Sequence, residues 1–312
     1  MKPKVYIDGK DGTTGLQIYD RLSARDDIEL LLIAEEKRKD PQERKKLMNE
    51  ADLVFLCLPD AAAVEAVALA DNPATKIIDA STAHRTAPGW DYGFPELSDA
   101  RREAITRSRR VANPGCHATG FISVVYPLIA AGVLPKDALL SCFSLTGYSG
   151  GGKKMIAQYE DPERETLLSS PGAYALGQAH KHLPEMRVVC GLDAAPIFSP
   201  IVDDYYKGMA TTVPLHMSQL RGVSALEDVR NVYRAHYGTG RGVVTVSDNA
   251  PNLLYGAAFA GRDTLSVVVS GNDECLTVTA LFDNLGKGAS GAAVQNMNLM
   301  LGFPETAGLN LD

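Results

Sequence analysis

Short apolar runs alternate with amphipathic stretches along the first third of the chain. Residues 5–8 predict a buried strand, and the apolar spacing that continues to residue 22 predicts a helix directly after it. Further strands are expected at residues 28–34, 52–59 and 76–79, with an alanine-rich helix at 61–70. Alternating strands and helices predict an α/β domain with a doubly wound, Rossmann-type sheet.

The pattern changes after residue 115, where the segments become longer and richer in β-branched residues. They predict one mixed sheet of strands at residues 138–145, 187–192, 208–214, 265–270 and 276–282. A helix is expected at 223–237, and the glycine-rich segment 144–153 predicts a loop that a ligand could order. This is an α+β pattern. A final apolar helix at 289–301 is expected to return to the first domain. We therefore predict a nucleotide-binding domain at 1–115, completed by 287–312, and a catalytic domain at 116–286.

Composition excludes several classes of protein. The 312 residues are enough for two domains. The formal net charge of −7 comes without a basic tail, so nucleic acid is not expected as a partner. No signal-peptide core and no stretch of about 18 uncharged apolar residues occurs, so no membrane contact is expected. Five widely spaced cysteines without a Cys-x-x-Cys pair indicate a reducing compartment, and we expect a cytoplasmic protein.

One cysteine lies where a turn is expected to give way to a helix. In the run 112–120, Pro114 and Gly115 predict the turn and Cys116 the first helical position. A helix N-terminus carries unpaired N–H groups and partial positive charge, which favour a thiolate. Cys116 is therefore a candidate nucleophile. The alternative is a buried cysteine beside an ordinary turn.

The first strand leads into a glycine-rich turn with the spacing Gly-x-x-Gly-x-x-Gly. Such a turn lets a backbone approach a pyrophosphate, which the following helix N-terminus can bind. The spacing is a variant of the usual dinucleotide motif. The next strand ends in the acidic pair Glu35 and Glu36, which suits a ribose hydroxyl, followed by basic residues 37–39, which suit a 2′-phosphate. This pattern alone leaves the choice of cofactor open. The glycine-turn candidates are Gly9, Gly12, Thr13, Thr14 and Gly15.

A second cluster carries proton-transfer chemistry. His180, His182 and Glu185 place two imidazoles and a carboxylate within six residues. A carboxylate can orient an imidazole that exchanges protons near neutral pH, so we predict acid/base work here. The alternatives are the start of a surface helix near Pro184 and a zinc site. We expect no metal, because no further ligand motif is evident.

Taken together, these motifs resemble the N-acetyl-gamma-glutamyl-phosphate reductases in their short form, within the semialdehyde dehydrogenase superfamily. The resemblance covers essentially the whole chain. The Cys116 turn and the His180 cluster are its most specific parts. The matching stretches are residues 6–15, 79–85, 93–97, 113–116, 147–153, 180–185 and 287–291.

The resemblance implies NADPH-dependent reduction of N-acetyl-L-glutamyl 5-phosphate to the semialdehyde, with release of phosphate, in arginine biosynthesis. Cys116 would form a thioester, and His180 would be the acid/base, with His182 as the competing histidine. A homodimer or homotetramer is implied. Substrate would contact Arg85, Asn113, Ser149, Gly150, His182 and Glu185. NADP would contact the glycine turn together with Ser81, Asn284, Gly288 and Ala289.

The chain departs from the family directly after the cysteine, where an aromatic residue, Pro and Thr are replaced by His117, Ala118 and Thr119. His117 could shift the ionisation of the thiol, but we interpret it as a spacer. An exposed structural role remains the alternative for Arg85. Two other functions compete with the reductase: an enzyme similar to aspartate-semialdehyde dehydrogenase, and a regulatory protein that senses NADP without turnover.

Overall fold

The computed structural model describes residues 2–238 and 242–312, and the chain divides into two compact units. The first unit comprises Met1–Pro114 and Ala289–Leu309. The second comprises Gly115–Gly288 and Asn310–Asp312. Each unit is built around a sheet of its own.

The first unit contains a parallel sheet of six strands in the order β2-β1-β3-β4-β6-β5. The order reverses beside β1, so the carboxyl ends of β1 and β3 form a topological switch point, where sheets of this class bind ligands. This arrangement confirms the predicted Rossmann-type fold. The strands are β1 Lys4–Asp8, β2 Glu29–Leu31, β3 Leu53–Leu56, β4 Lys76–Asp79, β5 Asp91–Tyr92 and β6 Arg110–Ala112.

Helices cover both faces of this sheet because its strands are apolar on both sides. Val5 and Ile7 of β1 pack in one core with Ile18 of α1, whereas Tyr6 packs in the other core with Met48 of α2. Alternate side chains of a strand point to opposite faces, which produces the two cores. The helices are α1 Thr13–Ser23, α2 Pro41–Glu50, α3 Asp60–Val67, α4 Asp99–Arg107 and α9 Gly291–Leu301.

The last helix belongs to this first unit although nearly all of the second unit precedes it in sequence. Val294 and Met297 of α9 are fully buried in the core that holds Val5 and Phe55. The first core is therefore incomplete until the C-terminal segment has been added.

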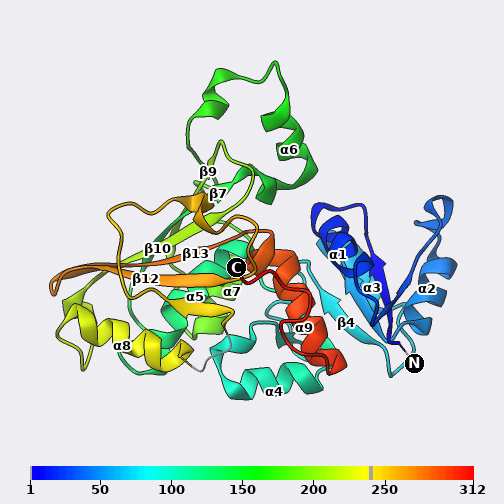
Figure 1. The fold of residues 1–312 in the computed structure, drawn as a ribbon, viewed down its shortest axis with the longest axis horizontal. Coiled ribbons are helices and arrows are strands. Elements are labelled where there is room, and N and C mark those ends of the chain that lie inside the picture. The colour runs from blue at the N-terminus through cyan, green and yellow to red at the C-terminus, as the bar shows by residue number, and fades with distance from the viewer. Residues whose placement is uncertain (1, 239–241) are drawn as a thin grey trace. The chain divides into compact units, whose positions relative to one another are not determined.

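The second unit contains a mixed sheet of seven strands in the order β11-β12-β13-β10-β7-β9-β8. The β7–β9 and β11–β12 pairs are parallel and the others are antiparallel, which confirms the predicted mixed sheet. Figure 1 shows β10, β13 and β12 running side by side. The strands are β7 Ser141–Gly147, β8 Gly172–Ala173, β9 Ile197–Asp203, β10 Met209–His216, β11 Val244–Val246, β12 Leu265–Gly271 and β13 Cys275–Phe282.

One helix, α5, is buried along most of its length against this sheet. Gly120 makes the close approach to β10 feasible, because a Cβ there would lie 2.3 Å from Oγ1 of Thr211. The helices of the unit are α5 Cys116–Ala130, α6 Gly152–Glu160, α7 Leu183–Cys190 and α8 Leu226–Tyr237. In the part of the chain that the structure describes, no helix has the length and hydropathy needed to cross a membrane.

The strand predicted at 187–192 is wrong, because this segment lies in and just after helix α7. Val188 and Val189 suggested a strand, but the buried positions Leu183, Met186 and Cys190 recur with helical spacing. Packing of this apolar stripe outweighs the weak preference of valine for strands.

The loop predicted at 144–153 is also wrong. Strand β7 continues to Gly147, a 3-10 turn spans Tyr148–Gly151, and α6 begins at Gly152. Strand β9 was missed, because Pro200 lies in the middle of it and proline normally indicates an edge or a non-strand. Its neighbour β8 has only two residues, so β9 lies close to the edge of the sheet.

Candidate active site

Cys116 is the first residue of α5, as the Pro-Gly turn predicts. Gly115 forms the N-cap in an extended conformation, and its N–H donates to Oε2 of Glu185 at 3.2 Å. Glu185 lies in the first turn of α7 and is 1% exposed. A buried carboxylate thus holds the backbone immediately before the candidate nucleophile.

The two histidines of the cluster differ in accessibility. His182 forms the N-cap of α7 and is buried, whereas His180 is half-buried. The His182 N–H donates to Nδ1 of His180 at 3.2 Å, and the two rings meet edge to face at 4.7 Å. Nε2 of His182 lies 4.0 Å from Oε1 of Glu185. His180 is therefore the more exposed of the two rings.

His117 is not a spacer, and that interpretation is wrong. Its Nδ1 lies 2.8 Å from the Ser144 hydroxyl and its Nε2 lies 2.7 Å from the Tyr174 hydroxyl. Burial and, to a smaller extent, nearby His180 together lower the pKa of His117 to about 3. His117 is consequently neutral at physiological pH and joins β7 to the Tyr174 segment.

Tyr174 is a site residue that the sequence analysis missed. It follows β8, and its N–H donates to the carbonyl of Pro200 at 3.1 Å. Burial raises the pKa of the Tyr174 phenol, and a thiolate charge on Cys116 raises it further. The Tyr174 hydroxyl contacts the ring of His117, the residue next to Cys116. No sequence motif indicates the position, because the folding of the second unit alone brings this segment to Cys116.

Ser149 and Asn284 meet at the ends of β7 and β13. Nδ2 of Asn284 donates to the Ser149 hydroxyl at 3.0 Å, and its Oδ1 accepts the Gly208 N–H at 2.8 Å. Both side chains are buried, while neighbouring Gly150 is exposed. Ser149 and Asn284 thus hold the turn together, and Gly150 presents its backbone to the surface of this unit.

Gly288 lies against the candidate nucleophile. A Cβ at Gly288 would lie 3.0 Å from Cβ of Cys116 and 3.1 Å from the carbonyl oxygen of Asp283. The residue is part of a π-helical turn, Gly286–Ser290, a rare geometry that is frequent at functional sites. Only glycine fits this approach without displacing a neighbour.

In the first unit, the glycine turn connects β1 to α1 beside β3. Gly9 has φ +86°, and a Cβ there would lie 2.4 Å from the Cys57 carbonyl oxygen. A Cβ at Gly15 would lie 2.4 Å from the carbonyl oxygen of Gly9. These two glycines are required by the fold itself. Gly12 forms the N-cap of α1 and has more room, since a Cβ there would lie 3.4 Å from its nearest neighbour.

The start of α1 fits a pyrophosphate. Thr13 and Thr14 open the helix, and its first turn carries no acidic side chain. A helix N-terminus without negative charge offers N–H donors to an anion. The arrangement at the switch point therefore suits the predicted dinucleotide.

A short 3-10 turn, Glu35–Lys37, follows β2, and Arg38 forms its C-cap. The Arg38 guanidinium forms an ion pair with Asp11, inside the glycine turn, and lies 3.0 Å from Glu35. Arg38 is about half exposed. The structure thus brings one of the three basic candidates to the glycine turn.

Arg85 lies after β4 among backbone carbonyls of the first unit. Its Nε donates to the Asn113 carbonyl at 3.0 Å, and Nη2 donates to the Ala80 carbonyl at 3.3 Å. The Asn113 side chain is buried and donates to the Ala289 carbonyl at 2.9 Å. Arg85 is therefore fixed at the carboxyl ends of β4 and β6.

Buried Asp79 organises the segment that leads to Arg85. Its carboxylate accepts the Ser81 N–H at 2.9 Å and the Ser81 hydroxyl at 2.7 Å, and lies 2.6 Å from Nδ1 of His84. The His84 ring stacks on Trp90. Ser81 is thus a buried structural partner of Asp79 as well as a cofactor candidate.

The structure gathers the predicted residues into two clusters, one in each unit. Among the residues it describes, no three histidine, cysteine, aspartate or glutamate side chains are arranged to hold a metal ion. The second-unit cluster comprises Cys116, His180, His182, Glu185 and Gly288, with Ser149, Gly150 and Asn284 at the end of β7. The first-unit cluster comprises Gly9, Gly12, Thr13, Thr14, Gly15, Ser81, Arg85, Asn113 and Ala289.

Comparison with known families gives matches to both units. The family described as "Semialdehyde dehydrogenase, NAD binding domain" matches residues 4–107. The family described as "Semialdehyde dehydrogenase, dimerisation domain" matches residues 116–284. Together these two matches span most of the chain.

Curated relatives and solved structures agree with this result. A Nostoc protein named N-acetyl-gamma-glutamyl-phosphate reductase 2 is 47% identical over 99% of both chains. A Brucella anthropi protein named N-acetyl-gamma-glutamyl-phosphate reductase is 48% identical over 97% of this chain and 99% of its own. Aspartate semialdehyde dehydrogenase II of Vibrio cholerae shares the fold, with a TM-score of 0.73 at 16% identity, over 96% of this chain and 98% of its own.

Proposed function

Because the chain belongs to the semialdehyde dehydrogenase family, and within it to the N-acetyl-gamma-glutamyl-phosphate reductases, we propose the reaction that it catalyses. The proposed reaction is the NADPH-dependent reduction of N-acetyl-L-glutamyl 5-phosphate to N-acetyl-L-glutamate 5-semialdehyde, with release of phosphate, in arginine biosynthesis. The observation that carries the proposal is Cys116 at the start of α5, with its preceding N–H held by Glu185.

The first chemical step belongs to Cys116. Its thiolate attacks the carbonyl carbon of the acyl phosphate, the C–O bond to phosphate breaks, and a thioester remains on the sulfur. The helix N-terminus stabilises negative charge on the thiol before attack. Gly288 packs against Cys116, since a Cβ at Gly288 would lie 3.0 Å from Cβ of the nucleophile.

The second step reduces the thioester. A bound nicotinamide supplies the hydride for this step. His180 then moves the proton: it protonates the oxygen that becomes a hydroxyl, and it accepts that proton again when the C–S bond breaks and the aldehyde leaves. The half-buried ring of His180 supports this role over the buried ring of His182.

We propose that His182 and Glu185 position the reacting residues through their hydrogen bonds. Glu185 accepts the Gly115 N–H and lies 4.0 Å from His182, whose own N–H positions His180. We propose that this chain of contacts orients the acid/base and the nucleophile together. We also propose His182 and Glu185 as substrate contacts, of which Glu185, at 1% exposed, is the more enclosed.

Substrate phosphate and carboxylate require cationic and polar partners. Arg85 supplies a guanidinium that can hold an oxyanion by two parallel hydrogen bonds, and carbonyl contacts fix its position. We propose that Arg85 and Asn113 bind the phosphate group, and we propose Ser149 and Gly150 as further substrate contacts.

We propose NADP as the cofactor, held by Gly9, Gly12, Thr13, Thr14 and Gly15. Arg38 supports NADP over NAD, because it reaches Asp11 in the glycine turn and can pair with a 2′-phosphate. Ser81, Asn284, Gly288 and Ala289 are proposed as further contacts.

Steady-state kinetics of Arg38→Ala test this preference. We expect KM for NADPH to rise by about tenfold or more, the cost of one charge-assisted hydrogen bond, while KM for NADH changes little. Arg107→Ala is the matched control, because Arg107 is an exposed arginine paired with Glu103 on α4. An equal rise in KM for NADPH and for NADH would show that Arg38 does not recognise the 2′-phosphate.

The reaction itself is best tested in reverse. Wild type, Cys116→Ser and Cys275→Ser are supplied with N-acetylglutamate semialdehyde, phosphate and NADP⁺, and NADPH absorbance is followed. We expect phosphate-dependent turnover in wild type and Cys275→Ser, and none in Cys116→Ser. Absence of turnover in folded wild type would reject the reductase, whereas turnover in Cys116→Ser would reject the thioester. If aspartate semialdehyde were turned over and N-acetylglutamate semialdehyde were not, the proposed substrate would be wrong and the aspartate-semialdehyde dehydrogenase alternative would be favoured.

Two further features belong to the proposal. We propose a homodimer or homotetramer assembled through the second unit, since the family matched there is described as a dimerisation domain. Light scattering after size-exclusion chromatography tests this.

We also propose a cytoplasmic location, because no disulfide joins the five cysteines within the described residues.

A further inference from the structure

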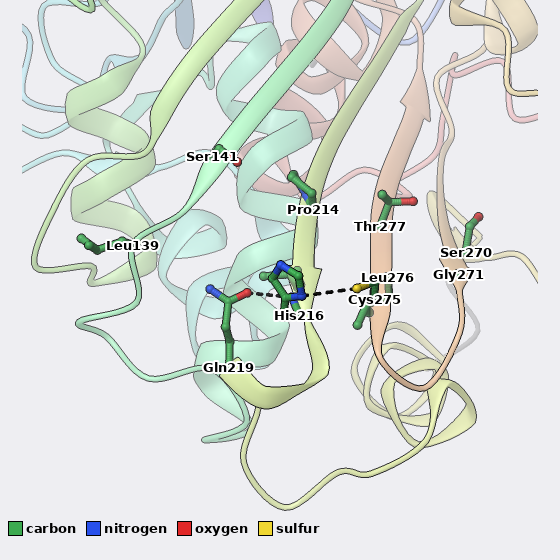
Figure 2. A pocket seen from close by; sticks show the side chains of 11 residues that line it. Leu139, Ser141, Pro214, His216, Gln219, Ser270, Gly271, Cys275, Leu276 and Thr277 are labelled. Atoms are coloured by element: carbon green, nitrogen blue, oxygen red, sulfur yellow. Dashed lines mark hydrogen bonds between the residues drawn. The ribbon is translucent and has the colours of Figure 1, made fainter.

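A pocket separate from the Cys116 cluster opens at the end of the second sheet where β10 finishes and β13 begins. Its volume is about 370 Å³. Figure 2 shows His216 and Cys275 next to one another among the residues that line it. Of the lining residues, only these two carry titratable side chains; leucines, a proline, a glycine and uncharged polar residues form the rest.

The sheet itself sets the distance between the two side chains. His216 and Cys275 are directly opposite one another in the antiparallel β10–β13 register, where cross-strand side chains lie in contact. Sγ of Cys275 is 3.3 Å from Nδ1 of His216. This is hydrogen-bond reach for a thiol and an imidazole, the arrangement of a nucleophile with its base.

Both residues are also fixed at the backbone. Oε1 of Gln219 accepts the His216 N–H at 2.7 Å, and Oδ1 of Asn272 accepts the Cys275 N–H at 2.9 Å. Gly271, with φ +125°, allows the tight turn that returns the chain to Cys275. The pair is therefore held on two strands and a hairpin turn rather than on a mobile loop.

The other cysteines outside the Cys116 cluster lack this setting. Burial raises the pKa of Cys57 and of Cys142, which keeps both as inert thiols. Cys190 is buried in α7. Cys275 combines an exposed thiol with an adjacent imidazole and a pocket next to it.

We propose that Cys275 and His216 form a second site with a reactive thiol, which takes small, uncharged disulfides into the adjacent pocket. His216 accepts the thiol proton, and the Cys275 sulfur attacks one sulfur of the incoming disulfide. The S–S bond of the reagent breaks, a mixed disulfide forms on Cys275, and the departing thiolate takes the proton from His216. The reaction needs no other oxidant, because the disulfide itself is reduced.

The pocket determines the class of reagent. A volume of about 370 Å³ is at the small end of ligand sites, and apart from the imidazole its lining offers no cation to a charged reagent. The site therefore favours 2-hydroxyethyl disulfide, which is uncharged, over oxidised glutathione, which carries several carboxylates.

Intact-mass and peptide mapping test the site on wild type, His216→Gln and Cys275→Ser. With 2-hydroxyethyl disulfide at pH 7, we expect an adduct on Cys275 that forms at least about threefold more slowly in His216→Gln. The expected effect is modest for two opposing reasons. Removal of the Cys275 proton by His216 increases the rate, but a thiolate that its surroundings stabilise is a weaker nucleophile, which partly offsets that gain. The adduct at this position is absent from Cys275→Ser, and oxidised glutathione reacts more slowly than the uncharged reagent.

Equal rates at Cys275 in wild type and His216→Gln would overturn the proposal, as would adducts confined to Cys116. Faster reaction with oxidised glutathione would reject the assigned reagent class. Folding of each variant is checked by comparing its thermal unfolding curve with that of wild type. The test stands apart from the proposed function, because adduct formation is measured by mass.

Discussion

Cys116 and Cys275 are the same residue type in two different settings. Cys116 occupies the first turn of a buried helix and has a carboxylate-held N–H before it, whereas Cys275 lies exposed on a strand opposite an imidazole. At this scale the chemistry depends on which groups lie within hydrogen-bond reach. The same holds for His117, whose two ring nitrogens both contact hydroxyl groups.

His117 makes stability depend on pH in a predictable direction. An unfolded histidine titrates near pH 6.5, and the folded pKa of His117 is about 3. Between these values only the unfolded state binds the proton. The contribution of His117 is therefore complete above about pH 6.5 and is lost as pH falls toward 3, by up to about 1.4 kcal/mol per pH unit.

Urea unfolding between pH 4 and 7.5 measures this dependence. We expect His117→Asn to be less stable at pH 7 but to show a shallower loss of stability toward acid. Ser144→Ala is the control, since it removes one hydrogen bond of His117 while leaving the buried ring in place, and so keeps the steep dependence. Parallel curves for wild type and His117→Asn would contradict the assignment.

Gly288 makes a second prediction at the residue scale. Gly288→Ala places a methyl group 3.0 Å from Cβ of Cys116, so the nucleophile must shift by a few tenths of an ångström. Because small misplacements at a reacting atom reduce rates strongly, we expect kcat to fall by about tenfold. Gly177→Ala is the matched control, with no atom within 4 Å of the added carbon. An unchanged kcat would show that the site adapts.

At the scale of elements, side chains of helix α8 supply hydrogen bonds to the backbone of helix α5. Pro127 lies inside α5 and has no N–H, so the Ser123 carbonyl lacks its usual helical donor. The Tyr237 hydroxyl, from α8, donates to that carbonyl at 2.7 Å. The neighbouring Val124 carbonyl accepts the Tyr233 hydroxyl. A side chain of α8 thus supplies the hydrogen bond that Pro127 removes from α5.

A double-mutant cycle tests this compensation. Tyr237→Phe leaves a buried carbonyl without a donor, and we expect a loss of about 1–3 kcal/mol in unfolding free energy. In a Pro127→Ala background the helix regains its own N–H donor to Ser123, so Tyr237→Phe then costs less. Urea unfolding of the four proteins measures the difference. An identical loss in both backgrounds would disprove the proposed coupling.

At the scale of the whole molecule, each unit has a core of its own, and the C-terminal helix α9 completes one side of the core of the first unit. Met297 of α9 is fully buried in the first core, and Met186 of α7 is fully buried in the second unit. Removing a buried methionine side chain leaves a cavity and typically costs about 2–5 kcal/mol.

Hydrogen exchange of the two methionine variants tests the division. We expect Met297→Ala to speed amide exchange in β1 and β3 while exchange in α5 stays as in wild type. Met186→Ala is its counterpart and is expected to speed exchange in α5 but not in β1. Uniform acceleration in both units by either variant would indicate a single cooperative core.

The predictions from sequence were most reliable where local pattern and local chemistry coincide. The Pro-Gly turn placed Cys116 at a helix start, the glycine turn after β1 was recognised, and the motifs indicated the family. Each of these features depends on residues that are neighbours in the chain. Backbone stereochemistry and short-range hydrogen bonding therefore determine them.

The errors occurred where packing competes with propensity. Residues 187–192 form a helix because their apolar stripe is buried, and Pro200 lies within β9 because its neighbours complete the sheet. Tyr174, the hydroxyl contacts of His117 and the Cys275–His216 pair also escaped prediction. They depend on strand register and loop packing between segments far apart in the chain. Such contacts exist only after the chain has folded, so only the tertiary structure decided them.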